Sequence, residues 1–176
     1  MKHFSILLVL ISAAFLFGCT SNQSNGAEFN HYENQQDKFA FDKPAAWVQQ
    51  PDPDMIVRLG DLQNASFAVG IVPGAKAADF DNVAATTYAD FQQNAGFFNL
   101  AQRNTTLAGQ PTVIITSDQS NVAISGQAVI STAELFIVQD TRNNRLLIVS
   151  FLANRDSLSS TSQTKQRMLN SFKIMQ

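Results

Sequence analysis

Cysteine is almost absent from this chain of 176 residues, and Cys19 is the only one. A single cysteine excludes an internal disulfide and a cysteine metal cluster, so the folded part depends on packing for its stability. Histidine is nearly as scarce, with His3 and His31 alone. Because a nucleophilic serine needs an activating base and no Gly-x-Ser-x-Gly motif occurs, a serine hydrolase is disfavoured.

The chain also lacks any run of basic residues. It holds 12 Lys and Arg against 14 Asp and Glu, and the cations are scattered singly. Binding a nucleic-acid backbone requires a clustered set of Lys and Arg that releases counterions. The sequence therefore predicts a slightly acidic, solvated surface and no nucleic-acid partner.

The first 18 residues have the pattern of a signal peptide. A short basic start at Lys2 precedes an apolar run over residues 4–17, which is shorter than the roughly 20 residues of a membrane-spanning helix. The run ends in Leu16, Phe17, Gly18 and Cys19. The alternative interpretation is an ordinary signal peptide that ends beside an incidental cysteine.

These four residues resemble the lipobox of bacterial lipoproteins, although a residue smaller than Phe17 is usual at that position. The resemblance implies that a signal peptidase recognises Leu16, Phe17 and Gly18, and that Cys19 carries the acyl chains, palmitate among them, as the first residue of the mature protein. Two or three acyl chains hold a protein stably on a membrane. Thr20 in place of Asp favours the outer membrane, facing the periplasm.

Composition divides the remaining chain into two parts. Residues 19–37 are rich in Asn and Gln and poor in large apolar residues, so we expect a lipidated flexible tether. Residues 38–176 contain most of the 14 Phe residues and have a length that suits one globular domain.

Within residues 38–176, short apolar runs alternate with turn residues. The spacing predicts strands at 39–41, 55–59, 67–71, 99–106, 112–116, 128–139 and 146–151, and helices from Asp79 to Gly96 and from Asp156 to about Phe172. Residues 141–144 predict a turn that pairs the two strands beside it as a central antiparallel hairpin. Strands grouped into blocks with short links indicate an α+β fold, an antiparallel β-sheet covered by α-helices.

Several segments resemble the Mog1p/PsbP-like superfamily: residues 39–44 with Trp47, the turn at 107–111, the strand at 146–151 and the closing residues 169–174. With the lipobox, the chain is most similar to the DcrB-like envelope lipoproteins of that group. The resemblance implies an α/β/α sandwich over residues 38–176 and no catalytic motif. Known roles in the group are adaptor or accessory ones: photosystem assembly, nuclear transport, envelope integrity and phage entry.

Candidate chemistry is sparse. His31 lies in the predicted tether without a second ligand, and Asp79 and Asp81 are explained as helix-start residues. Residues 70–76 look like a phosphate loop but lack its spacing and the Ser or Thr after Lys76. We expect no catalytic, metal or cofactor site.

Three aromatic residues, Trp47, Phe97 and Phe98, are the candidates for a groove that binds a partner or a lipid, with core packing as the alternative.

The preferred hypothesis is a membrane-anchored envelope lipoprotein that acts as a non-catalytic accessory protein and binds another envelope protein. An alternative is a periplasm-facing carrier of a small apolar ligand, which predicts an internal cavity lined by Phe and Ile. A third hypothesis, an enzyme that uses carboxylates alone, requires at least two acidic residues to converge in one cleft. Its candidates are Asp52, Asp54, Asp61 and Glu134.

Overall fold

The computed structural model describes residues 28–122 and 128–176. Leu16, Phe17, Gly18 and Cys19, on which the lipidation prediction rests, lie outside the described residues. Within the described ranges, no helix combines the length and the apolar character that a membrane span requires.

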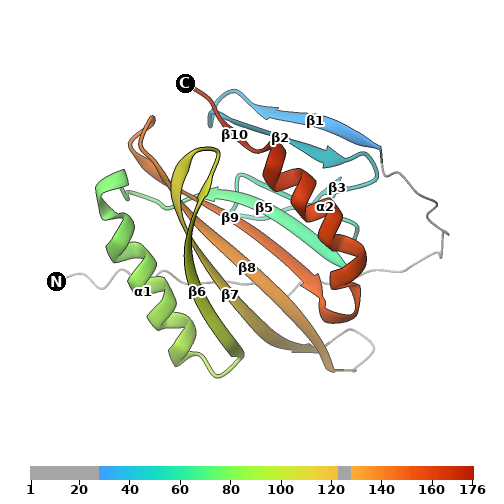
Figure 1. Cartoon of the computed structure of the whole chain (residues 1–176). Coiled ribbons are helices and arrows are strands. Elements are labelled where there is room, and N and C mark those ends of the chain that lie inside the picture. The colour runs from blue at the N-terminus through green and yellow to red at the C-terminus, as the bar shows by residue number, and fades with distance from the viewer. Residues whose placement is uncertain (1–27, 123–127) are drawn as a thin grey trace.

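The main body is an antiparallel sheet of seven strands in the order β3-β4-β5-β9-β8-β7-β6 (Figure 1). Its centre is the hairpin of β8 and β9, as the turn at residues 141–144 predicted. The strands, in chain order, are β3 (Val48–Gln49), β4 (Val57–Gly60), β5 (Ala65–Ile71), β6 (Phe97–Leu107), β7 (Gln110–Val122), β8 (Ala128–Asp140) and β9 (Arg145–Asn154).

A smaller sheet lies beside the main one, with the order β1-β2-β10. It consists of β1 (Phe29–Asn34), β2 (Phe39–Pro44) and β10 (Lys173–Ile174). β1 falls in the segment that composition assigns to the tether, so the predicted boundary at residue 38 differs from the structure. The reason is pairing: all six residues of β1 are in antiparallel register with β2, and Tyr32 packs on Phe39 and Phe41.

A tight turn fixes the β6–β7 hairpin. Ala108 and Gly109 join β6 to β7 and have φ of 52° and 74°. Positive φ at both central residues matches the right-handed twist of the flanking strands, and glycine adopts it without a steric penalty. The predicted turn is therefore confirmed, with Pro111 already inside β7 opposite Thr106.

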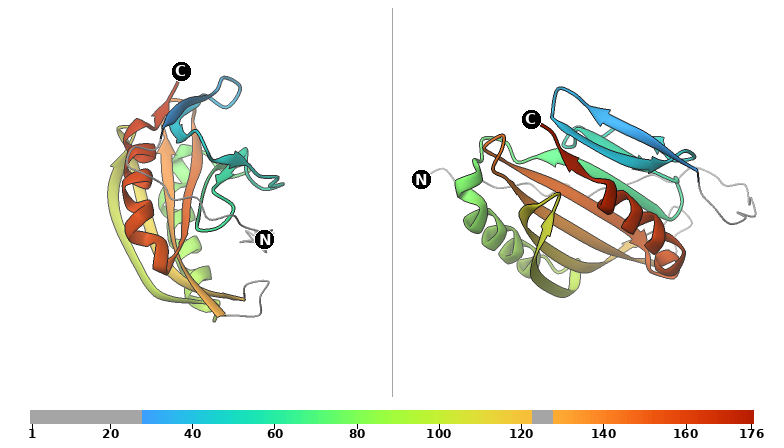
Figure 2. Two further views of the ribbon diagram at one scale, coloured as in Figure 1. Left: turned by 90° about the vertical axis from the view of Figure 1, so that its right-hand side faces the viewer. Right: turned by 45° about the horizontal axis from the view of Figure 1, so that its top comes forward.

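The two helices cover opposite faces of the main sheet (Figure 2). α1 (Phe80–Gln93), preceded by a 3-10 turn (Ala77–Asp79), packs through Val83, Ala84 and Phe91 on one face. α2 (Leu158–Ser171), preceded by a second 3-10 turn (Arg155–Ser157), packs through Met168 on the other face. The structure thus has the predicted α+β arrangement, a helix, a sheet and a helix in three layers.

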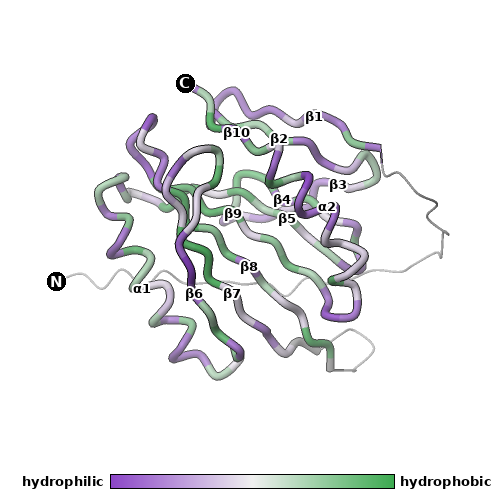
Figure 3. The backbone as a smooth tube through the Cα atoms, in the orientation of Figure 1, coloured by the Kyte–Doolittle hydropathy of each residue, from purple (hydrophilic) through white to green (hydrophobic). Residues whose placement is uncertain are grey.

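Alternation along the central strands supplies both cores. In β9, Leu147, Val149 and Phe151 point toward α2, while Leu146 and Ile148 point toward α1. Because successive side chains of a strand point to opposite faces, a strand buried on both sides must be apolar throughout. Figure 3 shows this in the hydropathy of the central strands compared with the more polar β1 and β6.

Candidate functional site

Three of the four candidate carboxylates have a structural partner of their own. Asp52 forms an ion pair with Arg58; the side chain of Arg58 is buried, and that of Asp52 is 10% exposed. Asp61 accepts hydrogen bonds from the backbone N–H groups of residues 63, 64 and 65, at 2.7 to 3.0 Å, and so holds the β4–β5 turn. Glu134 lies 2.6 Å from Lys165 Nζ. Asp54 is exposed and donates its backbone N–H to Asp52.

His31 does not lie in a tether but on β1, with an exposed side chain. Its Nδ1 is 3.2 Å from Asp42 Oδ1 and its Nε2 is 3.8 Å from Glu33 Oε2. Within residues 28–122 and 128–176, no three His, Cys, Asp or Glu side chains are grouped closely enough to hold a metal ion.

The three candidate aromatic residues do not form one groove. Trp47 is buried and stacks on Phe151, with ring centroids 6.4 Å apart, in the core under α2. Phe97 packs on Phe91, at 4.5 Å, in the core under α1. Only Phe98 is exposed, at 36% of its surface.

Phe98 belongs to a partly exposed surface at one end of β6, β7 and β8. Strand register places Phe98 opposite Asp118 and Asp118 opposite Thr132. Ile130 lies two residues before Thr132, on the same face of β8. α2 covers this same face of the sheet, because Phe136, which points to the same side of β8 as Ile130 and Thr132, lies in the core under that helix. Ile130, like Phe98, exposes 36% of its surface. We call Phe98, Asp118, Ile130 and Thr132 the Phe98 surface.

Asp118 is fixed at the centre of this surface. Its Oδ2 accepts a hydrogen bond from Asn99 Nδ2 at 2.9 Å, and its Oδ1 accepts one from Thr132 Oγ1 at 2.6 Å. These hydrogen bonds, the one from Asn99 first, lower the pKa of Asp118 below its ordinary value, because they stabilise the charged form. The carboxylate is therefore an oriented anion at neutral pH, flanked by two exposed apolar side chains.

An irregularity in β6 places Asn99 at this position. The register with β7 shifts between Phe98 and Ala101, and Asn99 has a φ of 54°. Asparagine tolerates this left-handed conformation better than most residues, and such bulges redirect side chains. Sequence reasoning considered Phe98 but not Asp118, whose partners lie 19 and 14 residues away along the chain.

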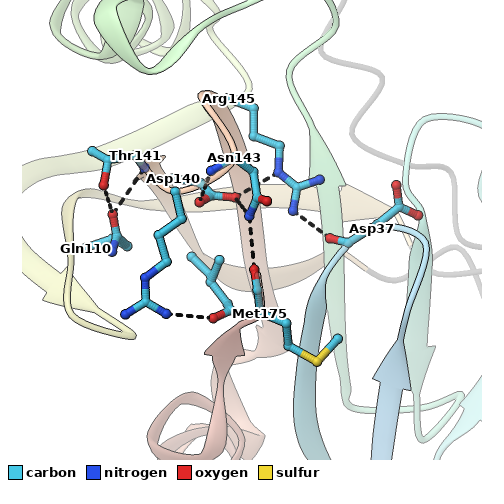
Figure 4. Close-up of polar contacts among 9 residues, drawn as sticks. Asp37, Gln110, Asp140, Thr141, Asn143, Arg145 and Met175 are labelled. Atoms are coloured by element: carbon cyan, nitrogen blue, oxygen red, sulfur yellow. Dashed lines mark hydrogen bonds and ion pairs between the residues drawn. The ribbon is translucent and has the colours of Figure 1, made fainter.

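A second polar cluster surrounds Asp140, at the β8–β9 turn (Figure 4). Asp140 is fully buried, and its carboxylate accepts hydrogen bonds from Arg145 Nε at 2.8 Å and from the backbone and side-chain nitrogens of Asn143 at 3.1 and 2.9 Å. Arg145 also donates to the carbonyl oxygen of Asp37, and Asn143 to that of Met175. The cluster connects the turn to the β1–β2 loop and to the C-terminal residues.

The donors and acceptors in this cluster satisfy one another. On the same turn, Arg142 donates to the carbonyl oxygen of Ile174, and Gln110 Oε1 accepts from both the backbone N–H and the hydroxyl of Thr141 (Figure 4). A buried charge that is paired and fully hydrogen-bonded has a structural role. We therefore assign this cluster to the fold rather than to ligand binding.

A hollow of about 410 Å³ lies beside the start of α1. The carrier hypothesis predicts a cavity lined by Phe and Ile, but this hollow is lined by mostly small side chains, some apolar and some polar. They are Val72, Pro73, Gly74, Ala75, Asp79, Asn82, Val83 and Thr86. Gly74 and Lys76 of the loop-like segment 70–76 follow the end of β5, where Gly74 has a φ of 73°. This segment is a strand end and a turn.

No family model and no curated protein matches the sequence. Solved structures do match the fold. The Ran-binding protein Mog1p of Saccharomyces cerevisiae aligns over 85% of this chain and 96% of its own, with a TM-score of 0.56 and 11% identity. LpqN of Mycobacterium tuberculosis, described as involved in cell envelope biogenesis, aligns over 84% and 92%, with a TM-score of 0.56 and 10% identity.

Cyanobacterial PsbP of Synechocystis aligns over 88% of this chain and 98% of its own, with a TM-score of 0.48 and 15% identity. The similarity to Mog1p and LpqN extends over 85% and 84% of this chain, and at this level of identity it establishes architecture rather than activity. The chain therefore has the α+β fold of Mog1p and LpqN, as the resemblance to the Mog1p/PsbP-like superfamily implied.

Proposed function

We propose that this protein is an envelope lipoprotein of the DcrB-like kind, anchored through acylated Cys19, which acts as a non-catalytic accessory protein by binding an envelope protein through the Phe98 surface. The observation that carries the proposal is the oriented carboxylate of Asp118 between the exposed side chains of Phe98 and Ile130. A fixed charge beside exposed aromatic and aliphatic groups is typical of protein-binding surfaces.

The chemistry of the surface indicates the partner. An ionised carboxylate with two satisfied hydrogen bonds still has lone pairs free to accept from a cationic or amide donor. The apolar side chains on either side provide area that a complex would remove from water. The partner would present an Arg or Lys bordered by apolar residues.

Two points support an accessory role over catalysis. Asp52 and Asp54 share the loop before β4, but Asp61 lies in the β4–β5 turn and Glu134 lies on β8. Asp52 and Glu134 are each held in an ion pair. LpqN, of similar fold, is described as involved in cell envelope biogenesis. An outer-membrane location with the domain facing the periplasm, and a part in envelope integrity or phage entry, belong to the same proposal.

The anchor is tested by intact mass spectrometry of the protein extracted from membranes. We expect acyl chains on Cys19 and a chain that begins there, and we expect the Cys19→Ala variant to fractionate as a soluble protein. An unmodified Cys19 in membrane-extracted protein would contradict the anchor.

The binding surface is tested by placing a photo-cross-linking amino acid at Phe98 in the membrane-bound protein. Leu62, which exposes 45% of its surface in the β4–β5 turn, is the matched control position. We expect one discrete cross-linked protein from position 98, lost on Asp118→Ala substitution, and none from position 62. Equal labelling from both positions would count against the Phe98 surface.

A further inference from the structure

The two edges of the main sheet differ greatly in length. At one edge, β3 consists of two residues, whereas β6 at the other edge consists of eleven. β6 is the last strand of the sheet, beyond β7 (Figure 1). An edge strand presents alternate backbone N–H and C=O groups without partners, and so offers a template for pairing with another strand.

The second half of β6 has few features that prevent such pairing. We call residues 101–107 the β6 edge. It is regular, because the bulge ends at Ala101, and it contains neither Pro nor Gly and only one charge, Arg103. β1, the long edge of the small sheet, carries His31 and Glu33. Natural edge strands are protected by charges, Pro, bulges and short length, and the β6 edge has little of this protection.

The β6 edge is also accessible from both faces of the sheet. Gln102, Asn104 and Thr106 lie on the α1 side, and all three are exposed. On the α2 side, Ala101 and Arg103 are exposed and Thr105 is half-buried. A strand laid against this edge would therefore have room for its side chains on either side.

We propose that the β6 edge pairs antiparallel with the β6 edge of a second copy of this chain, about a two-fold axis through Asn104, so that the two main sheets become continuous. The sequence of the edge is self-complementary about this residue. Arg103 lies opposite Thr105, Gln102 opposite Thr106, and Ala101 opposite Leu107. Polar residues therefore oppose polar residues, apolar residues oppose apolar ones, and the two copies of Arg103 do not lie directly opposite each other.

The other symmetric registers are poorer. Opposed residues must lie on the same face, so the axis passes through a residue rather than between two. An axis through Arg103 places two arginines directly opposite each other, which is destabilising. An axis through Thr105 leaves Ala101 and Gln102 without partners from the regular edge. Asn104 is the centre that pairs all seven residues.

This inference goes beyond the proposed function and uses neither Cys19 nor the Phe98 surface. The first test is disulfide formation in membranes from cells that express the full chain. Opposed residues of an antiparallel pair have Cα atoms about 4.5 or 5.5 Å apart, within the range of a disulfide. We expect Asn104→Cys to yield a disulfide-linked dimer on oxidation.

Thr106→Cys is the matched control. It lies on the same strand and the same face as residue 104, and both variants keep Cys19. In this register, however, the two copies of residue 106 are four positions out of alignment, or about 13 Å along the strands. A dimer from Asn104→Cys but not from Thr106→Cys supports the register. Equal dimer from both variants, or none from either, overturns it.

The second test is a charge exchange on the purified full chain in detergent, followed by analytical ultracentrifugation. Asn104→Lys alone and Asn104→Asp alone each oppose two like charges, so we expect the dimer dissociation constant of each to rise about two- to fivefold. An equimolar mixture should recover dimer at the wild-type level or above. A monomeric wild-type chain, or no difference between the separate and mixed variants, overturns the proposal.

Discussion

Lys165 of α2 and Glu134 of β8 form an ion pair, with Nζ 2.6 Å from Oε1, that joins the second helix to the main sheet. Both side chains remain about one-fifth exposed, at 23% and 20%. Solvent screens such a pair, so its contribution to stability is small compared with the apolar contacts beneath it.

We therefore expect Lys165→Met to lower the free energy of unfolding by less than about 1 kcal/mol. Met168, one turn further along α2, is fully buried. Met168→Ala removes buried apolar volume and should cost about 2–5 kcal/mol. Urea unfolding followed by circular dichroism measures both. Equal losses would show that the ion pair holds the helix as strongly as Met168 does, contrary to this expectation.

Asp140 behaves differently, because it has no access to solvent. Arg145→Ala removes the cation from a buried carboxylate, and we expect a loss of about 3–5 kcal/mol. Arg58→Ala, which leaves Asp52 without its partner, is the matched control at a second ion pair that is almost as buried. A loss below about 1 kcal/mol for Arg145→Ala in urea unfolding would mean that the turn rearranges to admit water.

Tyr32 predicts a sensitivity to alkali. Burial raises the pKa of Tyr32 above its ordinary value near 10.0, with the hydrogen bond to Asn34 opposing this and Asp37 adding to it. A raised pKa in the folded state contributes stability below pH 10 that is lost as the pH rises through the folded-state pKa. We expect unfolding to become easier in that alkaline range.

The measurement is the midpoint of urea unfolding against pH, with phenolate absorbance to follow the titration. In Tyr32→Phe, the alkaline loss should be smaller, and the remaining phenol is that of Tyr88. An alkaline limb identical in both proteins would assign the loss to other groups.

Gly60 has no room for a side chain. A Cβ there would lie 2.8 Å from the carbonyl oxygen of Ala65 and 2.7 Å from Gln50 Nε2. The first contact is with backbone on the neighbouring strand, so Gly60→Ala should cost about 1–3 kcal/mol. Gly96→Ala, where the nearest atom is Asn94 Oδ1 at 3.2 Å, serves as the comparison and should cost less. Thermal unfolding of the two variants distinguishes them.

The sequence predicted the main sheet well because its strands are long and their patterns are strong. β8 and β9 are apolar on both faces, and the helices show apolar residues at helical spacing. β1 was missed because its sequence, FNHYEN, is mostly polar. It is a strand through its pairing with β2 and the packing of Tyr32, which local composition does not reveal.

The candidate surface was predicted only in part, for a geometric reason. Phe97 and Phe98 are adjacent in sequence, but successive residues of a strand point to opposite faces, so one is packed on Phe91 and the other is exposed. Which of the two is exposed depends on the order of strands in the sheet. The carboxylate of Asp118 is oriented only because the fold brings the donors Asn99 and Thr132 beside it.

The position of β1 has a mechanical consequence. β1 pairs with β2 alone and belongs to the small sheet, not to the seven-stranded one. A pulling force that enters through the N-terminal residues is therefore borne first by the six-residue β1–β2 ladder. If that ladder yields, residues 28–37 are released as a segment with an extended length of about 33–36 Å, at roughly 3.3–3.6 Å per residue, while the main sheet keeps its pairing. β1 would then unfold under load before the main sheet does, and so protect the folded domain from force applied at its N-terminal end.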